Sequence, residues 1–284
     1  MSKNTQTPNL IAEIHTHSTV SDGALSPQRL AELMQRCGVG LWALTDHDTS
    51  EGCIEAAAAA KERGIRFISG IEISAKSRGQ SIHVLGYGFD PNHRAMIAYS
   101  EHMNAARADR MEAMRRRICE LGFEIHPEEV TSFSERGNLG RPHIARAMHA
   151  RGYVDSVQQA FDLYLADGRP AYVGMDWIGV DDAIDLLHDA GGIVILAHPA
   201  RYDIGGQLAG WVERGLEGLE VRHPAHELLD EARLIARCDR FGLLKTASSD
   251  FHGTEAPLEE LPGICGRVNF PVAWQEAFLA ALRY

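Results

Sequence analysis

Short apolar runs that are rich in branched and aromatic residues recur along the chain and predict buried β-strands. Even the longest falls well below the roughly 18 residues that are needed to cross a bilayer. We therefore expect these segments inside a packed core rather than in a membrane. The seven predicted strands lie at residues 10–14, 41–45, 67–73, 82–86, 193–197, 219–221 and 243–246.

Helical patterns separate most of these strands. Ser26 and Pro27 form a favourable helix start, and the helix that follows them ends at Gly38. Strand–helix alternation with short connections predicts parallel strands that are joined by right-handed crossovers. Three further helices are predicted at residues 51–63, 181–190 and 227–241.

The alternation breaks between the fourth and fifth strands. Residues 99–168 contain no convincing strand, but they include a long helical pattern at 101–121 and another at 142–151. We expect a helical insertion, or cap, at 99–168, carried by a barrel formed from residues 9–98 and 169–284. The insertion has nine arginines against eleven acidic residues, so it is not a basic arm for nucleic acid.

Composition and charge narrow the class of protein. The chain has 284 residues, of which 45% are hydrophobic and 24% charged, as in ordinary globular proteins. Its net charge of −11 argues against a protein that coats long nucleic acid. The five cysteines (positions 37, 53, 119, 238 and 265) are scattered, and residues 1–9 lack the apolar segment of a secretory signal. We expect a cytoplasmic protein without disulfides.

Imidazoles and carboxylates recur where the predicted strands end. The chain has 14 histidines, and many of them fall at these positions. In a parallel α/β barrel the carboxyl ends of the strands converge on one face, and that face carries the chemistry. The groups that we expect there are His15, His17, Asp22, His47, Glu72, His83, His198, His223, Asp250 and His252.

Neutral imidazole and carboxylate are the nitrogen and oxygen ligands of zinc, manganese and iron. His15 and His17 project to the same side of a strand because side chains alternate with a period of two. The set contains no cysteine, which argues against a thiolate-type structural zinc site. It is too large for one ion, so we expect two or three, which can together activate a water molecule for phosphoryl transfer.

These motifs jointly resemble those of the PHP (polymerase and histidinol phosphatase) family. The resemblance covers residues 9–98 and 169–284. The segments that carry it are residues 15–17, 45–48, 70–72, His83, 197–199 and 249–252.

The resemblance implies a distorted (β/α)7 barrel and metal-dependent hydrolysis of phosphate esters. Manganese is the expected metal, and iron or zinc remain alternatives. One metal ion would be held by His15, His17, Glu72 and Asp250. Glu72 would bridge to a second ion held by His83 and His198. A third would be held by Asp22, His47 and His252. Asp46 would either ligate or orient His47.

The helical insertion, with its sequence at 140–146, and the segment at 197–202 resemble a capped subgroup of the family. This subgroup contains 3′,5′-nucleotide bisphosphate phosphatases and 5′-to-3′ exoribonucleases of ribonuclease AM type. The resulting hypothesis is that a hydroxide bridging the metals attacks the 3′-phosphorus of a nucleoside 3′,5′-bisphosphate. Glu72 and Asp22 at the metals, and His223 as general acid, are the expected catalytic residues.

The second phosphate of such a substrate needs cations away from the metals. Candidate groups lie in the insertion and beyond two strand ends: Arg141, His143, Arg201, Arg222 and His223. Three alternatives stay open. They are an exoribonuclease acting on short 5′-phosphorylated RNA, a histidinol phosphatase, and a catalytically silent nucleotide-binding module.

Overall fold

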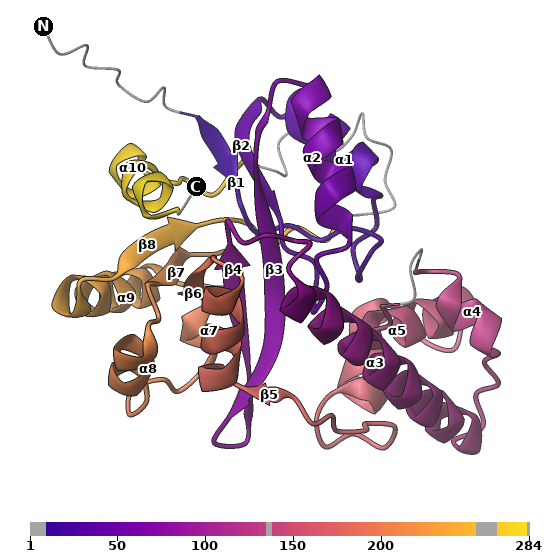
Figure 1. Ribbon diagram of the computed structural model, residues 1–284. Helices are drawn as coiled ribbons and strands as arrows, with labels where there is room; N and C mark the ends of the chain where they lie inside the picture. Colours follow the sequence, from indigo (N-terminus) through magenta and orange to yellow (C-terminus); the bar gives the residue numbers. More distant parts are fainter. Residues whose placement is uncertain (1–9, 135–137, 254–265, 283–284) are drawn as a thin grey trace, which may run out of the picture.

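The strands of the protein form one curved sheet that closes on itself (Figure 1). The computed structural model describes residues 10–134, 138–253 and 266–282. The strand order is β1-β2-β3-β4-β6-β7-β8, and β5 pairs with β3 outside this path. Just beyond β1 and β8, a parallel bridge between Thr16 and Phe251 joins the two edges. The sheet is therefore a distorted barrel.

The seven predicted strands are confirmed, with small shifts of their ends. The short β5 was not predicted, because two residues carry no readable pattern. The strands are β1 (Ile11–Glu13), β2 (Val39–Leu44), β3 (Arg66–Ser77), β4 (Gln80–Tyr87), β5 (Ile178–Gly179), β6 (Ile193–Leu196), β7 (Gly218–Arg222) and β8 (Leu244–Ala247).

One part of the predicted topology is wrong. The strands were expected to run parallel, but β4 is antiparallel to both β3 and β6. The reason is a tight hairpin between Ser77 and Gln80, which face each other in the register. Its two turn residues, Arg78 and Gly79, have φ values of 48° and 79°. Such a turn matches the twist of antiparallel strands.

The predicted helices are present, and additional short ones occur. Around the barrel lie α1 (Pro27–Arg36), α2 (Gly52–Glu62), α7 (Val180–Asp189), α8 (Leu208–Arg214), α9 (Leu228–Phe241) and α10 (Val272–Ala281). Between β4 and β5 lie α3 (Arg94–Glu120), α4 (Pro127–Thr131), α5 (Arg141–Ala150), α6 (Val157–Ala160) and a π-helical turn (Phe161–Leu165). Among the described residues, no helix is both long enough and apolar enough to span a bilayer.

The apolar core has several parts. One cluster lies between the sheet and α7, α8 and α9, and another lies under α1 and α2. A third fills the barrel interior, where Phe278 of α10 contacts Tyr87 edge-on at a ring separation of 5.2 Å. The Tyr87 hydroxyl donates to the carbonyl of Ile14 at 2.9 Å. These contacts fix β1, and with it the start of the loop that carries His15 and His17.

The long helix α3 belongs to two of these clusters. Met96 and Met103 near its start pack into the cluster between the sheet and the outer helices, whereas Met114 and Ile118 pack into a further cluster with α4 and α5. The helix therefore begins earlier than the predicted residue 101. The proposed boundaries of the cap, 99 and 168, stay a prediction.

The described cysteines, Cys37, Cys53, Cys119 and Cys238, are free thiols. Cys265 and the segment 1–9, on which the expectation of no signal peptide depends, lie outside the described residues.

Gly70 in β3 provides a test of how tightly the sheet is packed. A Cβ atom there would lie 2.6 Å from the carbonyl oxygen of Leu44 and 2.7 Å from Cγ2 of Thr45. Gly70→Ala should therefore lower the free energy of unfolding by about 1–3 kcal/mol, the usual cost of overpacking. Denaturant titration measures this change. Gly174→Ala is the control, because nothing lies within 4 Å of its Cβ position, and an equal loss in both variants would contradict the packing argument.

Candidate functional site

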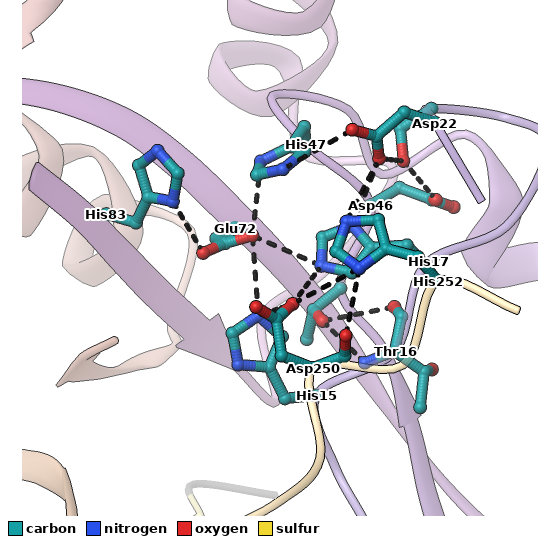
Figure 2. A network of polar contacts seen from close by, with 12 residues as sticks. His15, Thr16, His17, Asp22, Asp46, His47, Glu72, His83, Asp250 and His252 are labelled. Carbon is teal, nitrogen blue, oxygen red and sulfur yellow. Dashed lines mark hydrogen bonds and ion pairs between the residues drawn. The ribbon is translucent and has the colours of Figure 1, made fainter. Parts of the chain in front are cut away.

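Histidine and acidic side chains from six strands or strand ends gather at one mouth of the barrel (Figure 2). His15, His17 and Asp22 follow β1, and His47 follows β2. Glu72 lies within β3, and His83 within β4. His198 follows β6, and Asp250 and His252 follow β8. The nine expected ligands are thus brought to one place, although β4 enters in the opposite direction to the other strands.

Glu72 lies at the centre of this cluster, and 1% of its surface is exposed. Its Oε2 is 3.3 Å from His15 Nε2, 3.2 Å from His17 Nε2 and 3.1 Å from His47 Nδ1. Its Oε1 is 2.8 Å from His83 Nδ1 and 3.0 Å from His198 Nε2. A carboxylate that faces imidazoles with both oxygens has the geometry of a bridging ligand.

Several buried polar atoms in the cluster make no hydrogen bond within the described protein. A buried polar atom without a partner is costly and rare in folded proteins. Carboxylate oxygens and one nitrogen of each neutral imidazole ring offer lone pairs, so divalent cations between them would satisfy most of these atoms. They are His15 Nε2, His17 Nδ1 and Nε2, His47 Nδ1, Glu72 Oε2 and Asp250 Oδ1. The residues present therefore fit a metal centre.

The described residues form three groups of potential ligands, and within each group the ligand atoms lie within 4.8 Å of one another. One group matches the expected set of His15, His17, Glu72 and Asp250. The other two are His17, Asp22, His47 and His252, and His47, Glu72 and His83. His17 thus joins the expected third set, and His47 replaces His198 beside His83. His198 still contacts Glu72, and the assignment of ligands to individual ions stays a prediction.

Burial and charge set the protonation of these groups in opposite directions. Burial would raise the pKa of Glu72, but His47, His83 and His15 hold it well below the usual range. Burial lowers the pKa of His47 to about 3, although Glu72 and Asp22 act against the shift. Glu72 is therefore a carboxylate, which is the form that binds metal ions.

Backbone strain is concentrated at this mouth. Among the described residues, four non-glycine positions have positive φ, and three of them, Asp48 (55°), His198 (29°) and Asp250 (54°), lie in or beside the cluster. Such conformations are costly, and they persist at sites where the surrounding structure holds them. Here they place His198 beside Glu72 and Asp250 beside His15 and His17, whereas the side chain of Asp48 contacts Tyr99 and Arg107 of α3.

Contacts from the insertion reach the loops that carry Asp22 and His47. Arg146 of α5 donates to the carbonyl of Asp22 at 2.8 Å, and Asn138 donates to the carbonyl of His47. Arg107 of α3 forms a buried ion pair with Asp48. The insertion thus supports the outer part of the cluster directly.

A cavity of about 140 Å³ adjoins the cluster, and its lining combines candidate metal ligands with cations. Asp22, His47 and His83 contribute to it from the barrel. The lining cations from the insertion are Arg107, Arg110 and Arg141, beside the aromatic residues Phe161, Tyr172 and Trp177. Arg107 and Arg110 were not predicted to line a binding site, because an arginine in a long helical pattern usually lies on the solvent-exposed face.

The expected substrate-binding residues are only partly brought together. Arg141 lines the cavity and pairs with Asp167 at 3.0 Å. His143 is fully buried, and its Nδ1 accepts from the backbone N–H of Gly140 at 2.9 Å. Arg201 is exposed, outside the described lining of the cavity.

Arg222 does not reach this cavity. Its guanidinium lies 3.3 Å from Glu231, donates to the carbonyl of Asn269 at 2.9 Å, and sits over the ring of Trp274. Arg222 therefore bridges β7, α9 and the segment around α10, and it is not part of the proposed binding site.

His223 contacts the cluster through Asp250. Its Nδ1 accepts from the backbone N–H of Ala225 at 2.9 Å, which leaves the ring proton on Nε2. Nε2 lies 3.3 Å from Asp250 Oδ2. His223 thus contacts a candidate metal ligand, and its role as general acid stays a prediction.

Two buried acids have roles that the sequence did not indicate. Glu220 in β7 lies 3.0 Å from His15 Nδ1, and its only signal was a charged residue inside an apolar run. Asp46 accepts from the backbone N–H and hydroxyl of Ser18 and from the hydroxyl of Ser21. It therefore shapes the loop after β1, and it does not belong to the three ligand groups of the described residues.

Comparisons with known proteins agree with this geometry. A family model described as the PHP domain matches residues 13–166. A 3′,5′-nucleoside bisphosphate phosphatase of Chromobacterium violaceum is 33% identical, over 95% of this chain and 98% of the relative. A 5′-3′ exoribonuclease of Haemophilus influenzae is 36% identical, over 84% and 89%. A crystal structure from Bifidobacterium adolescentis, assigned as a metal-dependent phosphoesterase, is 30% identical, with a TM-score of 0.86 over 95% of both chains.

The unpartnered ligand atoms predict that divalent ions stabilise the fold. A site filled at 100 times its Kd adds about 2.7 kcal/mol to the free energy of unfolding. Manganese should therefore raise the melting temperature of the metal-stripped protein. Glu72→Gln should abolish most of this rise and reduce the metal content measured by mass spectrometry.

The control for this experiment is Glu112→Gln on the surface of α3, where the carboxylate pairs with Arg115. This variant should bind and respond to metal as the unmodified protein does. Full metal content in Glu72→Gln would remove Glu72 from the centre.

Proposed function

The chain belongs to the PHP domain family and is a hydrolase of phosphate esters, and we propose that it removes the 3′-phosphate from nucleoside 3′,5′-bisphosphates. The products are a 5′-nucleotide and inorganic phosphate. The metal centre is formed by the His, Asp and Glu side chains at the mouth of the barrel. It would hold two or three divalent ions, with manganese as the first expectation. The cytoplasmic location stays a prediction.

The observation that carries this proposal is the mixed lining of the cavity beside the metal cluster. Asp22, His47 and His83 belong to the candidate ligands, and Arg110 and Arg141 are cations in the same lining. A phosphate at the ligands and a second phosphate at the arginines would each meet complementary charge. Histidinol phosphate carries a single phosphate and would leave the arginines without an anion.

The three arginines differ in how much of their charge is already balanced. Arg107 is neutralised by the buried Asp48. Arg141 pairs with Asp167, which is 71% exposed, and such surface pairs contribute little. Within the described part of the chain, no carboxylate lies within ion-pair distance of Arg110, whose Nε donates to the carbonyl of Val173 at 2.8 Å.

The surroundings of Arg110 favour an anion. Burial, together with Arg141 and Arg107, lowers the pKa of Arg110 to about 10, because removal from water and the neighbouring positive charges both disfavour the charged guanidinium. Its guanidinium also lies 5.6 Å from the ring centres of Tyr172 and Trp177, which hold it toward the cavity. We infer that Arg110 and Arg141 bind the 5′-phosphate.

Divalent ions at this centre would supply the activated water and neutralise charge on the phosphate that is cleaved. The protein's own residues do the rest. Glu72 and Asp22 hold the ligand histidines in a common orientation through their contacts. The Arg107–Asp48 pair fixes the wall of the cavity nearest to His47. Arg110 and Arg141 orient the substrate through the phosphate that is retained.

A substrate panel with manganese tests the activity. The protein should release phosphate from adenosine 3′,5′-bisphosphate with a kcat/KM at least about 10-fold above that for adenosine 3′-monophosphate. The reason is that hydrogen bonds to charged groups contribute about 1.5–3 kcal/mol. Chromatography of the products should show the 5′-nucleotide. Release of the 5′-phosphate, or equal turnover of histidinol phosphate, would contradict the proposal.

Arg110→Met tests separately whether Arg110 binds the 5′-phosphate. It should lower kcat/KM for the bisphosphate by about 10- to 100-fold, the loss expected from charged hydrogen bonds. Turnover of the 3′-monophosphate should change by less than about 3-fold, because that substrate has no group at Arg110. Arg116→Met on the exposed face of the same helix is the control. Equal losses on both substrates would assign Arg110 a structural role.

A 5′-to-3′ exoribonuclease is the second candidate function. The cavity, about 140 Å³, is smaller than the 300–1,000 Å³ that is usual for ligand pockets. It fits a phosphate-bearing end of a substrate, and the remainder would extend outward, as an oligonucleotide could. A 5′-phosphorylated RNA trimer compared with the mononucleotide bisphosphate in the same assay distinguishes the two functions.

A further inference from the structure

Glu220 is a buried carboxylate inside β7 whose role the proposed reaction leaves open. It lies between Leu219 and Val221, which both pack into the core between the sheet and the helices. Because side chains alternate along a strand, Glu220 points to the other side, into the barrel. Its exposed fraction is 1%. A buried charge of this kind requires specific partners.

Both oxygens of Glu220 contact candidate metal ligands. Oε1 lies 3.0 Å from Nδ1 of His15. Oε2 accepts the backbone N–H of His198 at 2.8 Å. One carboxylate thus holds two ligand histidines that are 183 positions apart (198 − 15).

These two contacts orient the histidines toward Glu72. When Glu220 accepts the Nδ1 proton of His15, the lone pair of Nε2 is left for a metal ion. This Nε2 lies 3.3 Å from Glu72 Oε2. His198 is held with φ of 29°, and its Nε2 lies 3.0 Å from Glu72 Oε1. The two rings therefore approach the two oxygens of the same bridging carboxylate.

We propose that Glu220 is a positioning residue that sets His15 and His198 on the two oxygens of Glu72 and so couples the filling of adjacent metal positions. The proposal rests on the proposed function only through the presence of the metal centre. It concerns neither the substrate nor the reaction. Loss of Glu220 should weaken the binding of more than one ion, because both of its ligand partners lose their orientation together.

Glu217, which directly precedes β7, is a natural control. Its Oε2 lies 3.3 Å from Nε2 of His188 and accepts the backbone N–H of Val194 at 2.9 Å. Glu217 thus combines a histidine ring with an amide at β6, as Glu220 does, but it lies outside the three groups of potential ligands. A general effect of removing a carboxylate from this strand would appear in both variants.

The experiment compares Glu220→Gln with Glu217→Gln, using the full chain stripped of metal and titrated with manganese. In Glu220→Gln, calorimetry should show a 10- to 100-fold weaker affinity, the range for groups that orient metal ligands. Mass spectrometry of the reloaded protein should show the loss of more than one ion per chain. Glu217→Gln should bind within about 2-fold of the unmodified protein, because it supports no ligand.

Glu220→Asp keeps the charge and serves if Glu220→Gln does not fold. It should show an intermediate loss of affinity, because the shorter side chain cannot reach both partners. Unchanged stoichiometry and affinity in a folded Glu220 variant would overturn the proposal. If the variants lose metal as expected while the unmodified protein fails to cleave bisphosphates, the proposed function falls and this inference stands.

Discussion

The protein depends on a buried cluster of imidazoles and carboxylates that it cannot satisfy by itself. Glu72 faces histidines with both oxygens, and several lone-pair atoms around it make no hydrogen bond within the described protein. In a barrel interior such groups are costly unless cations join them. The strained backbone at His198 and Asp250 adds a further energetic cost to the same arrangement. Much of the surrounding structure serves to hold this cluster in place.

Two separate supports hold the cluster. From inside the barrel, Glu220 contacts His15 and His198. From outside, the insertion holds the outer loops through Arg146 on the carbonyl of Asp22 and through the Arg107–Asp48 pair. Metal binding and placement of the insertion are therefore physically linked. Helices of the insertion that line the cavity also contact the loops of candidate metal ligands.

The charge distribution explains how a strongly acidic protein can take an anionic substrate. The net charge of −11 is a property of the whole chain, whereas Arg107, Arg110 and Arg141 meet in one small cavity. Electrostatic interactions inside a partly buried site are screened less than those at the surface. Local arrangement therefore outweighs net charge at the site.

The sequence alone determined the strands and most helices, because hydrophobic periodicity is a local signal. It also predicted which histidines and acids meet, because parallel strands deliver their carboxyl ends to one face. The direction of β4 was predicted wrongly, because a tight turn at Arg78 and Gly79 reverses the chain where a crossover was expected. Only the tertiary structure showed that Glu220 contacts His15 and His198, that Arg222 lies away from the cavity and that Arg110 lines it. Those outcomes depend on which side chains compete for the same partner in space, and no local pattern contains that information.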